Sequence, residues 1–414
     1  MSRRAVLWVA FVLVHAGVAL LGFLMPNEPM GDVYRVYEPW SHAALSGGGI
    51  VGITSPWVYP QLALVPMVLA QGLGWIAGYT VGWALLATIV DALAFAVLVG
   101  RGRSTGRAVG AWFWLGFLAA LGPVGMYRLD GVTAALAVAG CLWLVGRPWL
   151  GSVLLSVATW MKVWPAALLA AAVISMRRRG AVIGGALIVT ALTLGVVYAA
   201  GGGAYAWGFV GQQTGRGLQL EAPVSAFYLW RAVARIPGSY IYYDQNIITF
   251  QVTGPNVDAV IAAMTPLLAL AVAGVALIGG LKAARGASFL ALFPVLGLAL
   301  VTAFIVFNKV GSPQYLTWIV APILLGLVLE RRRWWGMAAL ALAMALLTQA
   351  VYPLLYGQLL LADAFPAMLL TLRNALLLAM FAWSVVRLAR VPGRRRAGMA
   401  APAVRRVMPE RTSE

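Results

Sequence analysis

The chain has 414 residues, of which 62% are hydrophobic and only 10% are charged. A soluble domain carries about 25% charged residues, so this composition excludes an ordinary soluble protein and indicates one that lies in lipid. The net charge of +18 does not indicate nucleic-acid binding, because the basic residues form short clusters at the ends of apolar segments and no basic stripe with stacking aromatic residues is present.

A membrane-spanning helix needs about 20 apolar residues, and the chain contains such segments from its start almost to its end. They are 5–25, 79–99, 108–126, 130–146, 182–200, 257–281, 287–307, 315–330, 334–352 and 366–389. Segment 150–176 is interrupted by Lys162 and Pro165, so we expect two short helices that meet near the outer face. Counting that pair predicts an all-α polytopic protein of about twelve helices.

Charge indicates which connections lie on each side of the membrane. We assign 22 of the 30 Lys and Arg residues to connections and tails on one side, whereas most of the 12 acidic residues lie on the other. Basic connections stay in the cytoplasm, so both termini are predicted to be cytoplasmic. A single domain is expected over 1–389, followed by a basic cytoplasmic tail over 390–414 that is predicted to be disordered.

Two long outer loops follow from this assignment, at about 26–78 and about 201–256, and both are rich in the Trp and Tyr residues typical of a membrane interface. The short apolar segment 60–75 lies in the first loop. If it spanned the membrane, the next helix would place Arg101 and Arg103 outside. We therefore expect it to lie at, or partly in, the outer interface.

The first outer loop opens with three carboxylates within eleven residues, Glu28, Asp32 and Glu38. One interpretation is a solvated loop with an acidic bias. The other is a general base at a cleft that faces the membrane, because a carboxylate partly removed from water has a raised pKa and can accept a proton from a sugar hydroxyl. Gly31, before Asp32, would permit close approach of the backbone.

Two basic residues on the outer side are not explained by topology. Arg216 stands between two glycines of the second loop, and Lys309 lies in the connection 307–318. A guanidinium binds phosphate with two parallel hydrogen bonds, and an outer lysine is well suited to an anionic partner. The alternatives are a surface pair between Arg216 and Glu221, and a lysine that extends to the interface from an apolar position.

Four further ionisable residues lie in or near the predicted helices. Lys162, Asp130 and Arg373 stand close to outer helix ends, and Asp91 lies deeper. Ionisable groups in a membrane indicate either a functional site or ion pairs between helices, and the sequence favours neither. The two histidines have no spacing typical of a metal site, and no phosphate-binding or dinucleotide-binding motif is present. We therefore predict no essential metal and no cofactor.

Taken together, these segments resemble the C-type membrane glycosyltransferases, the GT-C superfamily. Within it they are most similar to glycosyltransferase family 87, the polyprenyl-phosphate-mannose-dependent alpha-(1,2) mannosyltransferases. The resemblance rests on six segments that occur in the family's order. They are GDV…YEPW (31–40), SPWVYPQLALVPM (55–67), RLDG (128–131), TWMKVWP (159–165), RGLQLE (216–221) and NKVGSPQYLTW (308–318). The chain departs from the family at 59–61, where Tyr-Pro-Gln replaces the expected Tyr-Pro-Pro.

The resemblance implies an inverting glycosyltransferase of the bacterial cytoplasmic membrane, with its active site on the outer face. It would move a mannosyl residue from a polyprenyl-phosphate donor to a glycolipid or envelope-glycan acceptor. Asp32 matches the general base. Binding of the donor phosphate is assigned to Lys309, Arg216 and Lys162, which would offset the developing charge. Acceptor or sugar binding is assigned to Glu28, Glu38, Tyr59, Glu221, Gln314 and Asp130.

A transporter or flippase of a lipid-linked or anionic substrate is the alternative function. Transporters often contain inverted repeats and broken helices near the middle of the membrane. Here the charged residues gather in outer loops, and one broken helix pair is predicted, which favours the enzyme.

Overall fold

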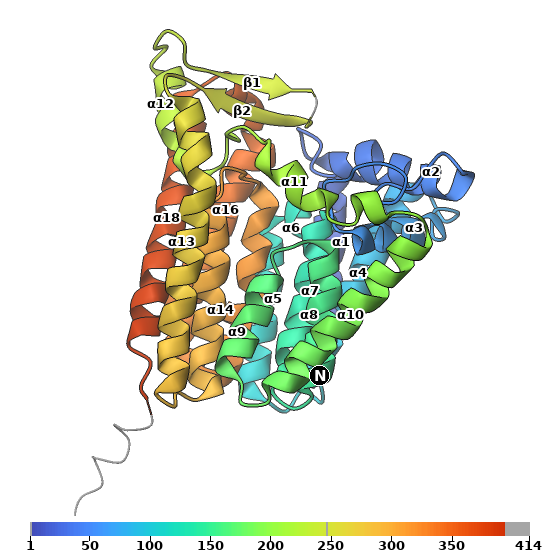
Figure 1. Cartoon of the computed structure of the whole chain (residues 1–414), viewed down its shortest axis with the longest axis vertical. Helices are drawn as coiled ribbons and strands as arrows, with labels where there is room; N and C mark the ends of the chain where they lie inside the picture. The colour runs from blue at the N-terminus through green and yellow to red at the C-terminus, as the bar shows by residue number, and fades with distance from the viewer. Residues whose placement is uncertain (1, 246, 394–414) are drawn as a thin grey trace, which may run out of the picture.

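The computed structural model describes residues 2–245 and 247–393 of the chain, and it is a bundle of apolar helices with loops and short elements gathered at one end (Figure 1). Seven helices in these residues are long and apolar enough to cross a membrane, by length and composition. Together with the shorter apolar helices beside them, they make the protein an all-α polytopic membrane protein, as the sequence predicts.

The first half of the bundle follows the predicted spans closely. Its helices are α1 (Arg3–Leu24), α4 (Tyr79–Val99), α5 (Thr105–Leu121), α6 (Pro123–Tyr127), α7 (Leu129–Leu144), α8 (Pro148–Met161), α9 (Ala166–Ser175) and α10 (Arg179–Ala199). The predicted break in 150–176 is confirmed, because α8 ends at Met161 and α9 begins at Ala166. Lys162 has an extended backbone there, and Pro165 precedes α9.

The second half also matches the prediction. Its elements are α13 (Val257–Ala284), α14 (Phe289–Val306), the 3₁₀-helix η5 (Pro313–Ile319), α15 (Val320–Glu330), η6 (Arg331–Trp334), α16 (Trp335–Gln349), the π-helix η7 (Ala350–Leu354), α17 (Tyr356–Leu360) and α18 (Ala364–Ala389). α14 is mostly buried and lies at the centre of the bundle, whereas α13 is mostly exposed at its edge.

The two long loops fold into short elements at the opposite end from the N-terminus (Figure 1). The first contains the π-helix η1 (Val33–Tyr37), α2 (Glu38–Ser46), the 3₁₀-helix η2 (Gln61–Ala63) and α3 (Leu64–Gln71). The second contains η3 (Gly203–Tyr205), α11 (Gly208–Thr214), η4 (Pro223–Ser225), α12 (Ala226–Val233), β1 (Tyr240–Asp244) and β2 (Thr249–Thr253). The strands β1 and β2 form an antiparallel pair in which Tyr242 faces Gln251, an element that was not predicted from the sequence.

Small residues bring the site-bearing helices α7 and α8 together. A side chain at Gly151 would lie 2.7 Å from the carbonyl oxygen of Gly140, and one at Gly140 would lie 3.1 Å from the carbonyl oxygen of Gly151. Membrane helices use small residues in this way because their backbones can then approach closely. This contact lies next to the short connection between the two helices, and it lets α7 and α8 pack closely side by side.

Residue 393, where the described chain stops, lies at the same end of the bundle as the N-terminus (Figure 1). An even number of crossings produces this arrangement. The predicted disordered tail begins just after α18, and residues 394–414 of it lie outside the described residues.

Candidate functional site

The turn between α1 and η1 has an uncommon backbone conformation. Asn27 and Glu28 have φ values of 57° and 49°, in the left-handed region that side chains disfavour. Such conformations persist where the surroundings enforce them, often at functional sites. Here the amide of Asn27 donates to the Pro353 carbonyl at 2.7 Å, and the Tyr352 hydroxyl donates to the carbonyls of Asn27 and Glu28 at 3.2 and 3.4 Å. The turn is therefore held against the segment after α16.

Asp32 immediately precedes the π-helix η1, a type of element that is frequent at functional sites. Its carboxylate forms an ion pair with Arg128, the residue between α6 and α7. The Asp32 side chain is 35% exposed, whereas the Arg128 side chain is 9% exposed. Arg128 also donates to the Tyr352 hydroxyl at 3.1 Å. The carboxylate is thus fixed on one side and accessible on the other, as a general base requires.

A second pair lies two residues along the chain. Asp130, at the start of α7, accepts from the Lys162 ammonium at 2.5 Å and from the Trp318 indole N–H at 2.6 Å. Leu129, between Arg128 and Asp130, donates its amide N–H to the hydroxyl of Tyr37 at 3.2 Å. At the start of α7, Arg128 therefore pairs with Asp32 of the first loop, and Asp130 pairs with Lys162 in the break between α8 and α9.

Aromatic rings surround the Lys162 ammonium. It lies 5.5 Å from the ring centre of Tyr59 and 5.3 Å from that of Tyr315, which stacks on Trp318 at 4.1 Å. A cation this close to a ring face is attracted by the ring's electrons. With Asp130 also bound, most of the Lys162 charge is already balanced within the protein.

The segments that carry Arg216 and Lys309 meet through their backbones. The amide N–H of Gln219 donates to the carbonyl of Lys309 at 3.0 Å. A side chain at Gly311 would lie 2.2 Å from the backbone nitrogen of Ala222, so only glycine fits at this crossing. The two segments are therefore held backbone to backbone, and the glycine of the NKVGSP run has a physical role.

Arg216 and Lys309, the two residues predicted to bind the donor phosphate, have different surroundings. Burial raises the pKa of Tyr59, as does the charge of Asp130, while the charge of Arg216 lowers it, so Arg216 stands near the Lys162 cluster. Its Nε is buried and has no hydrogen-bond partner in residues 2–245 and 247–393. Lys309 is buried, which lowers its pKa. The convergence of both side chains on one anion stays a prediction.

Glu221 does not form the predicted surface pair with Arg216. It is buried, and its carboxylate accepts from Arg373 of α18 at 3.2 Å. Burial raises the pKa of Glu221 to about 7, against the opposing charges of Arg373 and Arg128. The effect of Arg128 places Glu221 in the same electrostatic region as the Asp32 pair.

The remaining predicted site residues lie around this region. Glu28 pairs with Arg35 at 2.6 Å on the surface, Glu38 begins α2, and Gln314 is buried in η5. The carbonyl of Glu38 accepts from the side-chain amide of Gln71, at the end of α3, at 3.5 Å.

Sequence reasoning missed Arg128 and Tyr352 as site residues. The criterion that selected Arg216, a cation on the outer side, applies equally to Arg128, which belongs to the same RLDG run as Asp130. Tyr352 carried no such signal, because a tyrosine near a membrane interface is ordinary.

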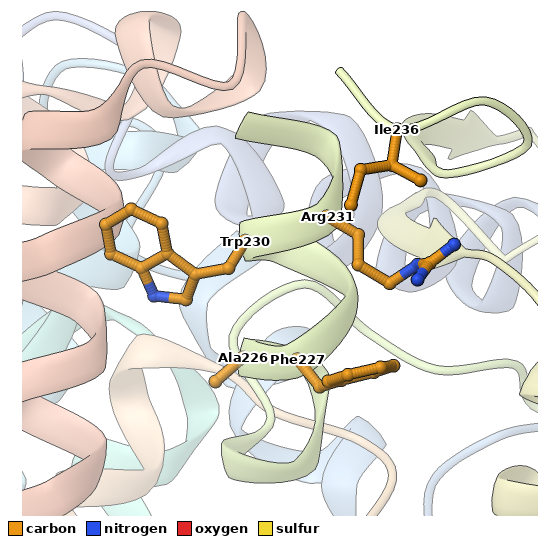
Figure 2. A pocket seen from close by; sticks show the side chains of 5 residues that line it. All are labelled: Ala226, Phe227, Trp230, Arg231 and Ile236. Carbon is orange, nitrogen blue, oxygen red and sulfur yellow. The ribbon is translucent and has the colours of Figure 1, made fainter. Parts of the chain in front are cut away.

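A separate cavity of about 390 Å³ lies beside α12 (Figure 2). It is lined by Ala226, Phe227, Trp230, Arg231 and Ile236. Figure 2 shows Trp230 on one side of the helix and Arg231 and Phe227 on the other, so these side chains do not converge. None of the predicted site residues lines this cavity.

These ion pairs connect loops and helix ends of an apolar bundle whose helices could cross a membrane. The model of glycosyltransferase family 87 matches residues 57–243, which include Arg128, Asp130, Lys162 and Arg216 but not Asp32. Over these residues the chain is similar to glycosyltransferase family 87, and this similarity indicates a membrane-embedded glycosyltransferase. No curated protein matches the chain.

Proposed function

We propose that this glycosyltransferase moves a mannosyl residue from a polyprenyl-phosphate donor to a glycolipid or envelope-glycan acceptor, with inversion at the anomeric carbon. The observation that carries the proposal is the Asp32 carboxylate, which is held by a buried arginine and still 35% exposed. In one displacement, the acceptor oxygen bonds to the anomeric carbon, the bond to the phosphate oxygen breaks, and Asp32 takes the hydroxyl proton. One carboxylate is sufficient, in contrast to the pair of a retaining glycosidase.

The leaving group is a lipid phosphate, which needs positive charge where its own charge develops. Arg216 supports this assignment, because a guanidinium nitrogen that is buried without a protein partner is costly unless a ligand uses it. Lys309 lies in the segment bonded to the same loop. Lys162 is already paired with Asp130, so we assign it a supporting part through its field.

The experiment is a transfer assay with purified protein in lipid nanodiscs. We expect release of polyprenyl phosphate from polyprenyl-phosphate mannose when a mannoside acceptor is present, and a product of inverted anomeric configuration. Polyprenyl-phosphate arabinofuranose and glucose donors test the sugar assignment. Movement of intact donor across the membrane without its cleavage would instead favour a flippase.

We further propose twelve membrane crossings, cytoplasmic termini and a site on the outer face of a bacterial cytoplasmic membrane. Single cysteines at Leu45, Tyr240 and Ser104 test this, because all three positions are exposed while the native Cys141 is buried. In intact cells, an impermeant thiol reagent should label positions 45 and 240 only. Labelling at position 104 would overturn the proposed orientation.

A further inference from the structure

A half-open groove of about 260 Å³ lies between the outer ends of α1 and α4, beside the first loop. Gly22, Phe23 and Met25 of the α1 end give it an apolar side. The exposed side chains of Phe23 and its neighbour Leu24, at 56% and 69%, show that this end of α1 faces the surrounding medium, which at an apolar helix is lipid. The groove therefore opens towards the hydrocarbon of the membrane.

The groove also has polar lining residues. They are Glu28 and Tyr34 of the first loop, which contributes the apolar Met30 as well, and Thr80, in the first turn of α4. Burial and the charge of Glu28 raise the pKa of Tyr34, so this tyrosine remains a neutral hydroxyl. The lining thus combines hydrocarbon with hydroxyl and carboxylate groups in one groove, which matches a molecule that is itself amphipathic.

We propose that this groove binds the acceptor, and that the acceptor is a lipid whose hydrocarbon chain lies along α1 and whose hydroxylated head group meets Glu28. The inference rests on the proposed function and selects a glycolipid acceptor over a free glycan. Asp32 is four residues after Glu28, and the tight turn between them is closed by the Gly31 amide donating to the Glu28 carbonyl at 2.8 Å. A head group in the groove is thus one turn of chain from the general base.

Charge separates this groove from the donor site. The cation at its rim, Arg35, is paired with Glu28 at 2.6 Å, so the groove offers no surplus positive charge to a phosphate. Arg216 and Lys309 lie instead in the second and third outer segments. A lipid phosphate is therefore directed to those segments, and a hydroxyl-bearing head group to the α1–α4 groove.

The size of the groove limits which part of the lipid it holds. Pockets that enclose a whole small molecule measure about 300–1,000 Å³. A groove of about 260 Å³ holds the head group and the first methylenes of a chain, and the rest of the chain stays in the bilayer. Each buried methylene corresponds to roughly a fourfold gain in binding, so even a short chain should have a measurable effect.

The test compares octyl mannoside with methyl mannoside as acceptors. We expect the wild-type protein to prefer octyl mannoside by at least about tenfold in kcat/KM. Thr80→Trp fills the groove from α4 and should remove most of this preference while leaving the donor KM unchanged. Ile89→Trp adds the same bulk to a position of α4 that is 50% exposed and does not line the groove, and it should behave as wild type.

A binding measurement separates this inference from the proposed function. An alkyl mannoside with a diazirine in its chain should label the peptide containing residues 22–34 in the absence of donor. The labelling should be lost in Thr80→Trp and kept in Ile89→Trp. Labelling without any release of polyprenyl phosphate would support the groove and overturn the proposed donor chemistry. Equal use of octyl and methyl mannoside, or labelling elsewhere only, would overturn the groove.

Discussion

Two carboxylate–guanidinium pairs at the outer end of the bundle have the same chemistry and different surroundings. Asp32 with Arg128 is 35% and 9% exposed, whereas Glu221 with Arg373 is 5% and 3% exposed. A carboxylate can receive a proton from a substrate only if the substrate reaches it. The first pair is open enough for a ligand to reach it, whereas the second is enclosed and joins the second loop to α18.

The buried pair has a structural consequence that the exposed pair lacks. Removing one partner of a buried ion pair leaves an uncompensated charge, which costs about 3–5 kcal/mol. Glu221 lies next to Ala222, where Gly311 makes its close crossing, so the pair with Arg373 fixes the meeting of the second and third outer segments. Substitutions in the Asp32 pair should therefore alter the transfer rate, and substitutions in the Glu221 pair should alter stability.

The largest effect is expected for Asp32→Asn. The amide keeps the shape of the side chain but cannot accept the acceptor's proton, so transfer should fall by roughly 10²–10⁴-fold, with donor binding and folding retained. Asp258→Asn makes the same change at an exposed position of α13 and should behave as the wild type. Should Glu28→Gln abolish turnover while Asp32→Asn keeps it, the base has been assigned to the wrong carboxylate.

Arg128 should come next. Arg128→Lys loses the planar fork that reaches both Asp32 and Tyr352, and transfer should fall by about 10–100-fold, the equivalent of one charged hydrogen bond. In Arg128→Gln the positive charge is lost as well, so transfer should fall at least as far as in Arg128→Lys.

Arg35→Gln is the matched control for Arg128, since it removes an exposed arginine from the pair with Glu28 in the same region. Its transfer rate should stay close to that of the wild type. A similar loss in both variants would mean that overall charge, and not contact with Asp32, controls the rate.

Substitutions at Arg216 and Lys309 are expected to change the KM for the donor. Arg216→Gln, Arg216→Lys and Lys309→Ala should each raise the donor KM by about 10–100-fold, because a charged hydrogen bond to phosphate is lost or weakened. Arg231→Gln makes the same change of charge in the second outer loop, at an arginine bonded to Ser239 at 3.0 Å, and should leave the donor KM unchanged. Unchanged donor KM in all four variants would remove Arg216 and Lys309 from the site.

The smallest effect concerns pH and stability. The pKa of Glu221 is raised by burial to about 7 from an ordinary value of 4.5. Between these values the folded protein holds a proton that the unfolded chain has released, so stability should decrease as pH rises from about 5 to about 7. The thermal midpoint of the solubilised protein measures this. Glu221→Gln should flatten the slope, and Asp32→Asn should not.

The sequence by itself determined where the helices lie, because the cost of placing polar residues in lipid acts on each segment separately. It located the break at Lys162–Pro165 and the gathering of loops at one end for the same reason. It also indicated the first-loop carboxylates and the cations Arg216 and Lys309 as candidate site residues, since their charges are not explained by membrane topology.

Only the tertiary structure decided which charges meet. Asp32 pairs with Arg128 at the start of α7. Glu221 pairs with Arg373, 152 residues away, and not with the nearby Arg216. The β1–β2 pair and the close crossing at Gly311 were hidden for the same reason. Partners of this kind are fixed by packing between distant segments, and a single sequence records the charge of each residue but not the distance between two of them.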